Sequence, residues 1–340
     1  MLITPINTQQ YNKINFNQHK NFDVHSQQSF KTSAITQAKT NWYLLGQQKL
    51  ISFGNKISVN NVEKVKTDAS KTHKTPGLIA DVLVTHSCNM HCPHCVDDFV
   101  NKSDEIVSLD KVDEFFTLLK NEVTDKWEEN YDEKPKIEIM LLGGEPTMAG
   151  AEHLNKIAEL AHKNGFDILI STNGKNKEVI SKIVPNFDWV QLTCRTDQEI
   201  DSWRPFKDKI NIKMPGDESL TFEKFKHFEE YAKDFGRRSL IMYFDSNYNE
   251  TCKDEQMWDY LNGLDWEQKG NYLLAYTPNG TRIKRRFHGV LDTTTSPLYP
   301  KLHPNGNYNT TWSNDELDLN LPNNIFINIE KRFKDNSELE

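Results

Sequence analysis

Hydrophobic positions divide the chain into a polar first part and a regularly patterned second part. Residues 1–40 are rich in Asn and Gln and keep no helical or strand period, which predicts a flexible polar arm. Residues 41–77 contain short β-like runs separated by Gly and Asn, which predict a small β-hairpin extension. From residue 78 onward, continuous apolar runs alternate with amphipathic stretches.

This alternation predicts a core of βα units over residues 78–264. The apolar runs of strand length are 79–86, 136–142, 167–172, 188–194, 209–214 and 239–244. The stretches with helical spacing are 109–127, 148–165, 177–184, 221–236 and 254–264. Because each strand is an uninterrupted apolar run, we expect a parallel sheet covered on both faces. Six such units make either an open doubly wound sheet or a partial barrel, since a full barrel needs eight.

Residues 265–340 are rich in Asn, Pro and Gly and predict a short α+β capping region. Two β-like runs stand out, YLLAYT from residue 272 and IFINI from residue 325. Residues 272–287 predict a hairpin with an Asn-Gly turn and a basic second arm. That arm is either a solvated strand face or a patch for an acidic peptide, a phosphate or RNA.

Composition narrows the functional classes. The 340 residues carry a net charge of -8, which argues against a general nucleic-acid binder, and RNA is not an expected partner. No apolar run reaches the length of a membrane span or a signal peptide, so we expect a cytoplasmic protein with no membrane partner. The five cysteines are too few and too uneven for a disulfide scaffold.

Three of these cysteines form a tight group in the loop after the first predicted strand. Cys88, Cys92 and Cys95 have the spacing C-x3-C-x2-C, at the strand end where α/β active sites collect. Three thiolates on one loop suit three corners of a [4Fe–4S] cluster and leave the fourth iron open to a small molecule. The alternative is zinc, with a nearby histidine as fourth ligand: His86, His91 or His94.

Four motifs together resemble the radical S-adenosylmethionine (radical SAM) superfamily. The cysteine run CNMHCPHC is similar to the family signature, with His94 at its hydrophobic position. Residues 143–147 resemble the GGEP motif, and residues 171–174 resemble the (S/T)NG element. The fourth predicted strand, with the arginines that follow it, resembles a further family segment. The resemblance covers about residues 79–245. In the order and style of its motifs, the chain is most similar to the peptide-modifying maturases.

The resemblance implies a fold, cofactors and a reaction. The expected fold is a partial (β/α)6 TIM-like barrel. Its expected cofactors are one [4Fe–4S] cluster, held by the three cysteines, and S-adenosylmethionine on the open iron. In this family an electron from the cluster cleaves S-adenosylmethionine, and the resulting 5′-deoxyadenosyl radical abstracts a hydrogen atom from the substrate. A flavodoxin or ferredoxin is the expected electron donor.

The resemblance also implies contacts with S-adenosylmethionine. Gly143, Gly144, Glu145 and Pro146 would surround the methionine ammonium, with glycines because the backbone must approach closely. A second set would contact the ribose, the carboxylate or the adenine: His94, Ser171, Asn173, Thr193, Arg195 and Arg204. Arg195 stands where the family has an aspartate, so an ordinary surface arginine is its alternative. Asn173-Gly174 is also an ordinary turn dipeptide.

Only one cysteine lies beyond residue 200, so we expect no auxiliary cluster. Cys252 follows the sixth predicted strand and is a candidate hydrogen donor, because a thiol performs this step in radical epimerases of peptides. Its alternative is a buried, idle cysteine. Tyr243 and Cys194 are weaker candidates, and Cys194 should point toward the outer helices.

Three functional hypotheses follow. The leading one is a radical SAM enzyme that modifies a peptide or protein by cross-linking, epimerisation or another C–H functionalisation. The second is a radical SAM enzyme for a nucleotide or another small molecule, with RNA modification as a minor variant. The third is a non-catalytic iron–sulfur or zinc protein, such as a sensor or scaffold. The GGEP and STNG elements argue against the third, because a scaffold needs no contacts to S-adenosylmethionine.

Overall fold

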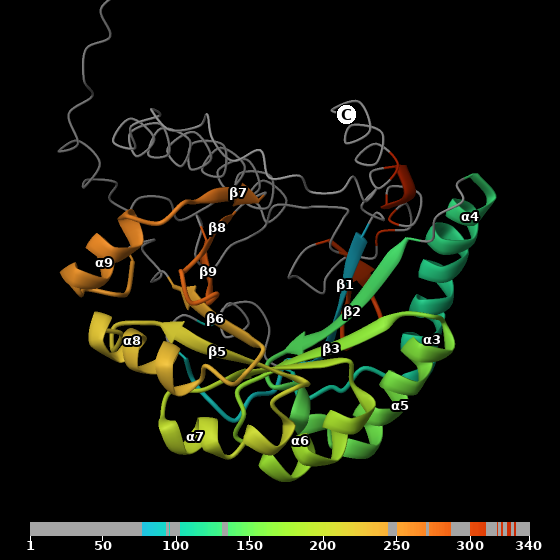
Figure 1. Ribbon diagram of the computed structural model, residues 1–340. Coiled ribbons are helices and arrows are strands. Elements are labelled where there is room, and N and C mark those ends of the chain that lie inside the picture. Colours follow the sequence, from blue (N-terminus) through green and yellow to red (C-terminus); the bar gives the residue numbers. More distant parts are fainter. Residues whose placement is uncertain are drawn as a thin grey trace, which may run out of the picture. The chain divides into compact units, whose positions relative to one another are not determined.

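A parallel sheet forms the centre of the computed structural model (Figure 1). The structure describes residues 77–92, 95, 103–130, 135–243, 250–269, 272–286, 300–310, 318, 321, 325–327 and 330. The predicted arm 1–40 and almost all of the hairpin extension 41–77 lie outside the described residues, and the predicted boundaries stay predictions.

Six parallel strands follow one another in sequence order across this sheet. They are β1 (Gly77–Thr85), β2 (Lys136–Gly143), β3 (Asp167–Thr172), β4 (Trp189–Thr193), β5 (Ile210–Gly216) and β6 (Arg237–Met242). Each overlaps one predicted apolar run, so the six predicted strands are confirmed. The sheet stays open, since β1 and β6 pair with further strands and not with each other. The predicted partial (β/α) barrel of TIM-like type is therefore confirmed.

Helices follow the strands as the pattern predicted, with local differences. They are α3 (Leu109–Leu119), α4 (Lys126–Asn130), α5 (Ala151–Lys163), α6 (Lys177–Ile183), α7 (Asp197–Asp201), α8 (Phe222–Tyr231) and α9 (Glu255–Asn262). The single helix predicted over 109–127 is interrupted by a π-helical turn, η2 (Lys120–Asp125). Helix α7 was not predicted, although Thr196 and Glu199 have the spacing of a capping box. In the structure the Thr196 hydroxyl accepts the Glu199 N–H at 3.3 Å.

The two faces of the sheet differ in chemistry. Figure 1 shows α3, α5, α6, α7 and α8 along one face, which we call the outer face. Alternate strand residues such as Ile170, Leu192 and Ile212 are fully buried and belong to the core formed with these helices. Their neighbours on the opposite, inner face are half-buried and mostly polar, Ser171 and Gln191 among them. The inner face is therefore not the apolar filling of a closed barrel.

The described part of residues 265–340 adds further strands to both edges of the sheet. Strands β7 (Glu267–Lys269), β8 (Tyr272–Tyr276) and β9 (Arg282–Arg286) join beside β6, and β8 and β9 form the predicted hairpin. Strand β10 (Lys301–Leu302) pairs with β1 in parallel, and β11 (Tyr308–Asn309) pairs with β10. A buried ion pair fixes β10, because the Lys301 Nζ lies 3.3 Å from the Asp81 carboxylate.

One predicted β-like run is wrong. Residues 325–327, the start of IFINI, are helical. Ile325 is buried in the core, and the Phe326 ring packs edge-on against Trp127 of α4 at 6.1 Å between centroids. Tertiary packing thus overrides the β propensity of this short run. Among the described residues, no helix is both long and apolar enough to cross a membrane.

The Asp81–Lys301 ion pair predicts a large cost for losing one partner. Lys301→Met leaves the buried Asp81 carboxylate without its cation and should destabilise the apo protein by about 3–5 kcal/mol in urea denaturation. The double variant Asp81→Leu with Lys301→Met should recover most of that loss. Lys136→Met removes two exposed ion pairs, to Glu138 and Asp167, and should cost less than about 1 kcal/mol. Equal losses for Lys301→Met and Lys136→Met would contradict the buried pair.

Candidate active site at the strand ends

The cysteine loop begins directly after β1 and turns sharply. The Thr85 hydroxyl accepts the Ser87 N–H at 3.1 Å, and the Cys88 Sγ accepts the Met90 N–H at 3.4 Å. The Cys95 N–H donates to the Cys92 carbonyl oxygen at 3.0 Å. These local bonds fold the loop back on itself, so the three cysteines stay at the carboxyl end of the strand.

The three thiols form one electrostatic group. Burial raises the pKa of the Cys88 thiol, and the negative charges of Glu145, Cys95 and Cys92 raise it further. All three cysteines are half-exposed, so a bound group could reach each sulfur. Among the described residues, no group of three His, Cys, Asp or Glu side chains is arranged to hold a single metal ion, and His94, an alternative fourth zinc ligand, lies outside them. Each cysteine of an iron–sulfur cluster binds a different iron, so the donor set fits a cluster.

The glycines at the end of β2 are required by the chain itself. Gly143 has a φ of +122°, and a methyl group there would lie 2.2 Å from the Thr85 carbonyl oxygen. A methyl group at Gly144 would lie 2.3 Å from the Ser87 carbonyl oxygen. The Gly144 N–H donates to Thr85 at 2.7 Å, and the Glu145 N–H donates to Ser87 at 2.8 Å. The backbone of Gly143 and Gly144 therefore lies very close to another segment of the chain. That segment is the backbone that leads into the cysteine loop.

Glu145 lies at the centre of the site and is only 1% exposed. One carboxylate oxygen accepts the Thr147 N–H at 3.1 Å and the Thr147 and Thr172 hydroxyls, each at 2.6 Å. The other oxygen accepts the Asn173 N–H at 2.8 Å. These four hydrogen bonds compensate the burial of the carboxylate. The Glu145 side chain therefore links the end of β2 to the end of β3, and its hydrogen-bonding capacity is largely used by the chain.

The remaining residues of the two motifs surround this carboxylate. Pro146 is buried and begins the short 3-10 helix η3 (Pro146–Ala149). The Ser171 hydroxyl accepts the Gln191 side-chain N–H at 3.2 Å on the inner face. The Asn173 side chain donates to the Asn89 Oδ1 at 2.7 Å, so it contacts the cysteine loop. His94 lies outside the described residues, and its predicted adenine contact stays a prediction.

The residues predicted on β4 and after it separate into two groups. Thr193 is half-buried at the end of β4 and is the register partner of Lys213 on the inner face. Arg195 is exposed, and its guanidinium lies 3.6 Å from the Asp217 carboxylate in the loop after β5. Both residues lie at the strand ends with the motifs above.

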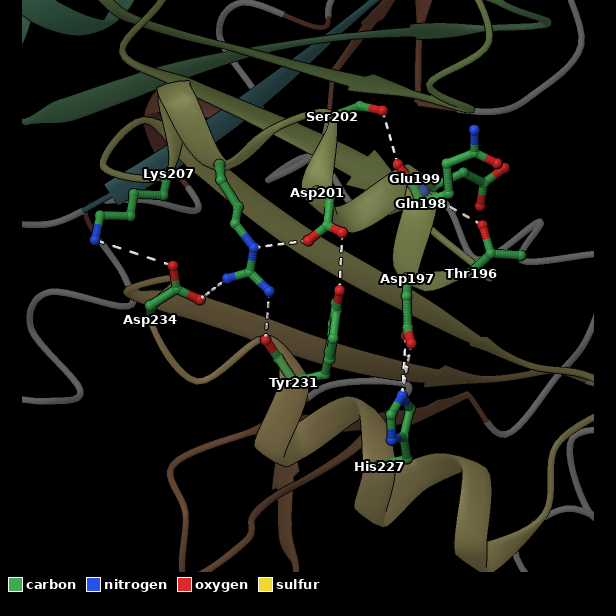
Figure 2. A network of polar contacts seen from close by, with 11 residues as sticks. Thr196, Asp197, Gln198, Glu199, Asp201, Ser202, Lys207, His227, Tyr231 and Asp234 are labelled. Atoms are coloured by element: carbon green, nitrogen blue, oxygen red, sulfur yellow. Dashed lines mark hydrogen bonds and ion pairs between the residues drawn. The ribbon is translucent and has the colours of Figure 1, made fainter.

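Arg204 is not brought together with the other predicted residues. Figure 2 shows the polar network of α7 and α8 to which it belongs. Its guanidinium donates to Asp201 at 2.8 Å, to Asp234, and to the Tyr231 carbonyl oxygen at 2.9 Å, and Asp201 and Asp234 raise its pKa. The Tyr231 hydroxyl closes the network by donating to Asp201 at 2.8 Å. The structure thus gives Arg204 partners that link two outer helices.

The two isolated cysteines are buried. Cys194 is 1% exposed, belongs to the core on the helix side as predicted, and has a pKa raised to about 12 by burial. Cys252 is 2% exposed, and its thiol donates to the Leu220 carbonyl oxygen at 3.6 Å. The residue before it, Thr251, lies at the ends of β5 and β6, where its hydroxyl donates to the Gly216 and Tyr243 carbonyl oxygens. The hydrogen-donor role of Cys252 stays a prediction. Tyr243 lies one residue past β6 and is half-buried, and its carbonyl oxygen accepts the Thr251 N–H at 3.1 Å.

Sequence reasoning missed three side chains that hold the site together. Thr147 and Thr172 donate to Glu145, and Asn89 accepts from Asn173. The signal for the threonines was their place inside the two motifs, where a hydroxyl next to a buried carboxylate is a natural donor. No local signal marked Asn89, because its partner lies 84 positions away.

Gly144→Ala should destabilise the apo protein by about 3 kcal/mol, because the added methyl group meets backbone atoms that cannot move independently. Gly236→Ala is the matched control, since no atom lies within 4 Å of its added methyl group, and it should change stability by less than about 0.5 kcal/mol. Urea denaturation measures both. A Gly144→Ala protein as stable as the control would show that the loops can separate without cost.

The burial of Cys194 and Cys252 predicts selective thiol chemistry. Alkylation of the apo protein at pH 8 should modify Cys92 and Cys95 first, and Cys88 more slowly because burial raises the pKa of its thiol. Cys194 should react only in denaturant, because a pKa of about 12 leaves roughly one thiol in 10⁴ ionised at that pH. Raising the pH toward 12 increases its thiolate fraction. Peptide mass mapping reads each site. Burial predicts slow labelling of Cys252, and labelling as fast as that of Cys92 would contradict that burial.

The motifs coincide with a known family. A family model described as the radical SAM superfamily matches residues 82–253, half of the chain. A Methanocaldococcus jannaschii protein named as a glycyl-radical enzyme activating enzyme is 27% identical over 148 residues, which cover 42% of this chain and 52% of that protein. A 7,8-dihydro-6-hydroxymethylpterin dimethyltransferase of the same organism is 29% identical over 143 residues, which cover 38% of this chain and 26% of that protein.

A solved structure also matches. Streptococcus suis SuiB bound to the precursor peptide SuiA aligns with a TM-score of 0.44 and 12% identity, covering 80% of this chain and 72% of that one. The match spans about half the length of the first curated relative and about a quarter of the second. Because the family model covers half of the chain, including the cysteine loop and both glycine-containing motifs, the chain belongs to the radical SAM superfamily, whose enzymes use a [4Fe–4S] cluster and S-adenosylmethionine.

Proposed function

We propose that this radical SAM enzyme abstracts a hydrogen atom from a peptide or protein, and that the substrate lies along the inner face of β3–β6. Cys88, Cys92 and Cys95 would hold the cluster, and the backbone at Gly143–Glu145 would hold the methionine part of S-adenosylmethionine. When bound, these cofactors supply a 5′-deoxyadenosyl radical. The chain's own part is to fix both loops and to orient the substrate.

Two polar rows on the inner face carry this proposal. Ser171, Gln191 and Asn211 are register partners on β3, β4 and β5. The row nearer the strand ends is Thr193, Lys213, Ser239 and Arg282, on β4, β5, β6 and β9. Ser239 is fully buried and donates to the Asn211 Oδ1 at 3.5 Å, so it supports the rows from within. The half-buried hydroxyls, amides and cations beside it can offer hydrogen bonds, whereas the same face of a filled barrel is apolar.

The length of the second row suits an extended chain. Four neighbouring strands at about 4.8 Å separation span roughly 14 Å. An extended peptide advances about 3.3–3.6 Å per residue, so four residues cover the same distance. A peptide presents a donor and an acceptor at nearly every residue, which matches a row of repeated polar groups. The M. jannaschii relative named as an activating enzyme for glycyl-radical enzymes agrees with a polypeptide substrate.

The second candidate is a small-molecule substrate. The relative named as a dihydropterin dimethyltransferase favours it, since a pterin is a compact polar heterocycle. Such a molecule would use part of one polar row. The two candidates therefore differ in how much of the inner face the substrate contacts.

Isotope transfer separates the two candidates. The reconstituted, reduced enzyme receives S-adenosylmethionine and deuterated extracts of the source cells, divided into peptides and small metabolites. Deuterium should enter 5′-deoxyadenosine with the peptide fraction, and prior digestion of that fraction to amino acids should abolish the transfer. Cys92→Ala should form no 5′-deoxyadenosine. Deuterium from the metabolite fraction alone would favour the second candidate and contradict the first.

The inner face can be tested with the same assay. Asn211→Leu removes one polar group of the first row and should raise the KM for the active fraction about two- to tenfold. Cleavage of S-adenosylmethionine without substrate should not change. Glu138→Gln, at the far end of β2 and paired with Lys136, is the matched control and should leave the KM unchanged. An unchanged KM in Asn211→Leu would place the substrate elsewhere.

A further inference from the structure

The cysteine loop touches the β3 loop through one side-chain hydrogen bond. The Asn173 Nδ2 donates to the Asn89 Oδ1 at 2.7 Å. Asn89 stands between two predicted cluster ligands, directly after Cys88 and before Cys92. In the described stretch 88–92, the structure shows no other side chain bonded to a neighbouring βα unit. The bond therefore joins the cluster-binding loop to the loop that carries the STNG motif.

Asn173 is held rigidly on its own side. Its backbone N–H donates to the buried Glu145 carboxylate at 2.8 Å. Its Oδ1 accepts the Lys175 N–H at 3.0 Å, which fixes the orientation of the side-chain amide. The Nδ2 is then the atom that faces Asn89, so Asn173 donates and Asn89 accepts.

Fewer contacts hold Asn89 in place within the cysteine loop. Its residue is exposed, and its neighbours are bound within the loop, where the Cys88 Sγ accepts the Met90 N–H. Beyond Ser87, whose carbonyl oxygen accepts the Glu145 N–H at 2.8 Å, the described loop residues make no backbone hydrogen bond to β2 or β3. A loop of this kind samples other conformations unless a distant contact restricts it.

We infer that Asn89 is a positioning residue, and that its bond to Asn173 couples the geometry of the cluster loop to the loop that binds S-adenosylmethionine. When the bond is formed, both loops share one arrangement, and each binding event favours the other. Asn89 acts through Asn173 and not on the substrate. The inference depends on the superfamily assignment and is independent of whether the substrate is a peptide or a small molecule.

The expected size of the effect follows from an exposed, neutral hydrogen bond. Such a bond shifts an equilibrium about two- to tenfold. Losing it should therefore loosen the loop and weaken S-adenosylmethionine binding by a factor in that range, without unfolding the core. Because coupling is reciprocal, the same factor should appear in cluster retention with and without S-adenosylmethionine.

Hydrogen exchange of the apo chain tests the bond without cofactors. Asn89→Ala and Asn173→Ala should each speed amide exchange in residues 88–92 about two- to tenfold, and the double variant should add nothing further. Asn89→Asp keeps an acceptor for the Asn173 Nδ2 and should behave like the natural chain. Asn262→Ala, at the exposed end of α9, is the control and should leave this exchange unchanged.

The reconstituted enzyme tests the coupling. In Asn89→Ala, the dissociation constant of S-adenosylmethionine should rise about two- to tenfold, with a smaller S-adenosylmethionine-induced change in the EPR signal of the reduced cluster. Asn262→Ala should match the natural enzyme in both. Additive effects of the two alanine variants on exchange would show that the side chains of Asn89 and Asn173 do not act through a shared hydrogen bond. Faster exchange in Asn89→Ala with an unchanged dissociation constant would overturn the coupling and leave a structural contact only.

Discussion

The buried Glu145 carboxylate is the constraint on which the rest of the site depends. A charge that is 1% exposed is tolerable only if donors surround it, and those donors come from the ends of two different strands. Satisfying the carboxylate therefore fixes the relative position of the β2 and β3 loops. The Gly143-Gly144 backbone then meets the β1 loop at a distance that admits no side chain. One electrostatic requirement thus determines the spacing of three loops.

The two faces of the sheet have different roles. The outer face stabilises the fold, and the inner face carries the polar groups. Isoleucine, leucine and valine on the outer side pack with the helices into one core. The inner side carries hydroxyls, amides and cations in register, which contribute little to that core. Substitutions on the inner face can therefore change what the enzyme binds without removing the apolar contacts that hold the strands. The outer network of Arg204, Asp201 and Tyr231 belongs to the stabilising side.

The sequence predicted what depends on local pattern. Continuous apolar runs marked all six central strands, and the motif spacing placed the cysteines and glycines at the strand ends. It did not predict that the Glu145 carboxylate is used by Thr172 and Asn173, because donors are chosen by tertiary position. It did not place Arg204 among the outer helices. The pairing of β10 with β1 was also hidden, since a two-residue strand has no period and its partner is far away in sequence.

The pairing of β10 with β1 has a consequence for biosynthesis. The strand that leads into the cysteine loop is synthesised long before Lys301 and Leu302, the residues that cover its edge. Until then β1 presents an unpaired edge, the kind of surface at which nascent chains associate wrongly. Completion of this edge, and with it the buried environment of Asp81, therefore cannot occur before Lys301 and Leu302 have been synthesised. The edge of β1 beside the cysteine loop is therefore completed only after β2–β6 have been synthesised, although β1 precedes them in the sequence.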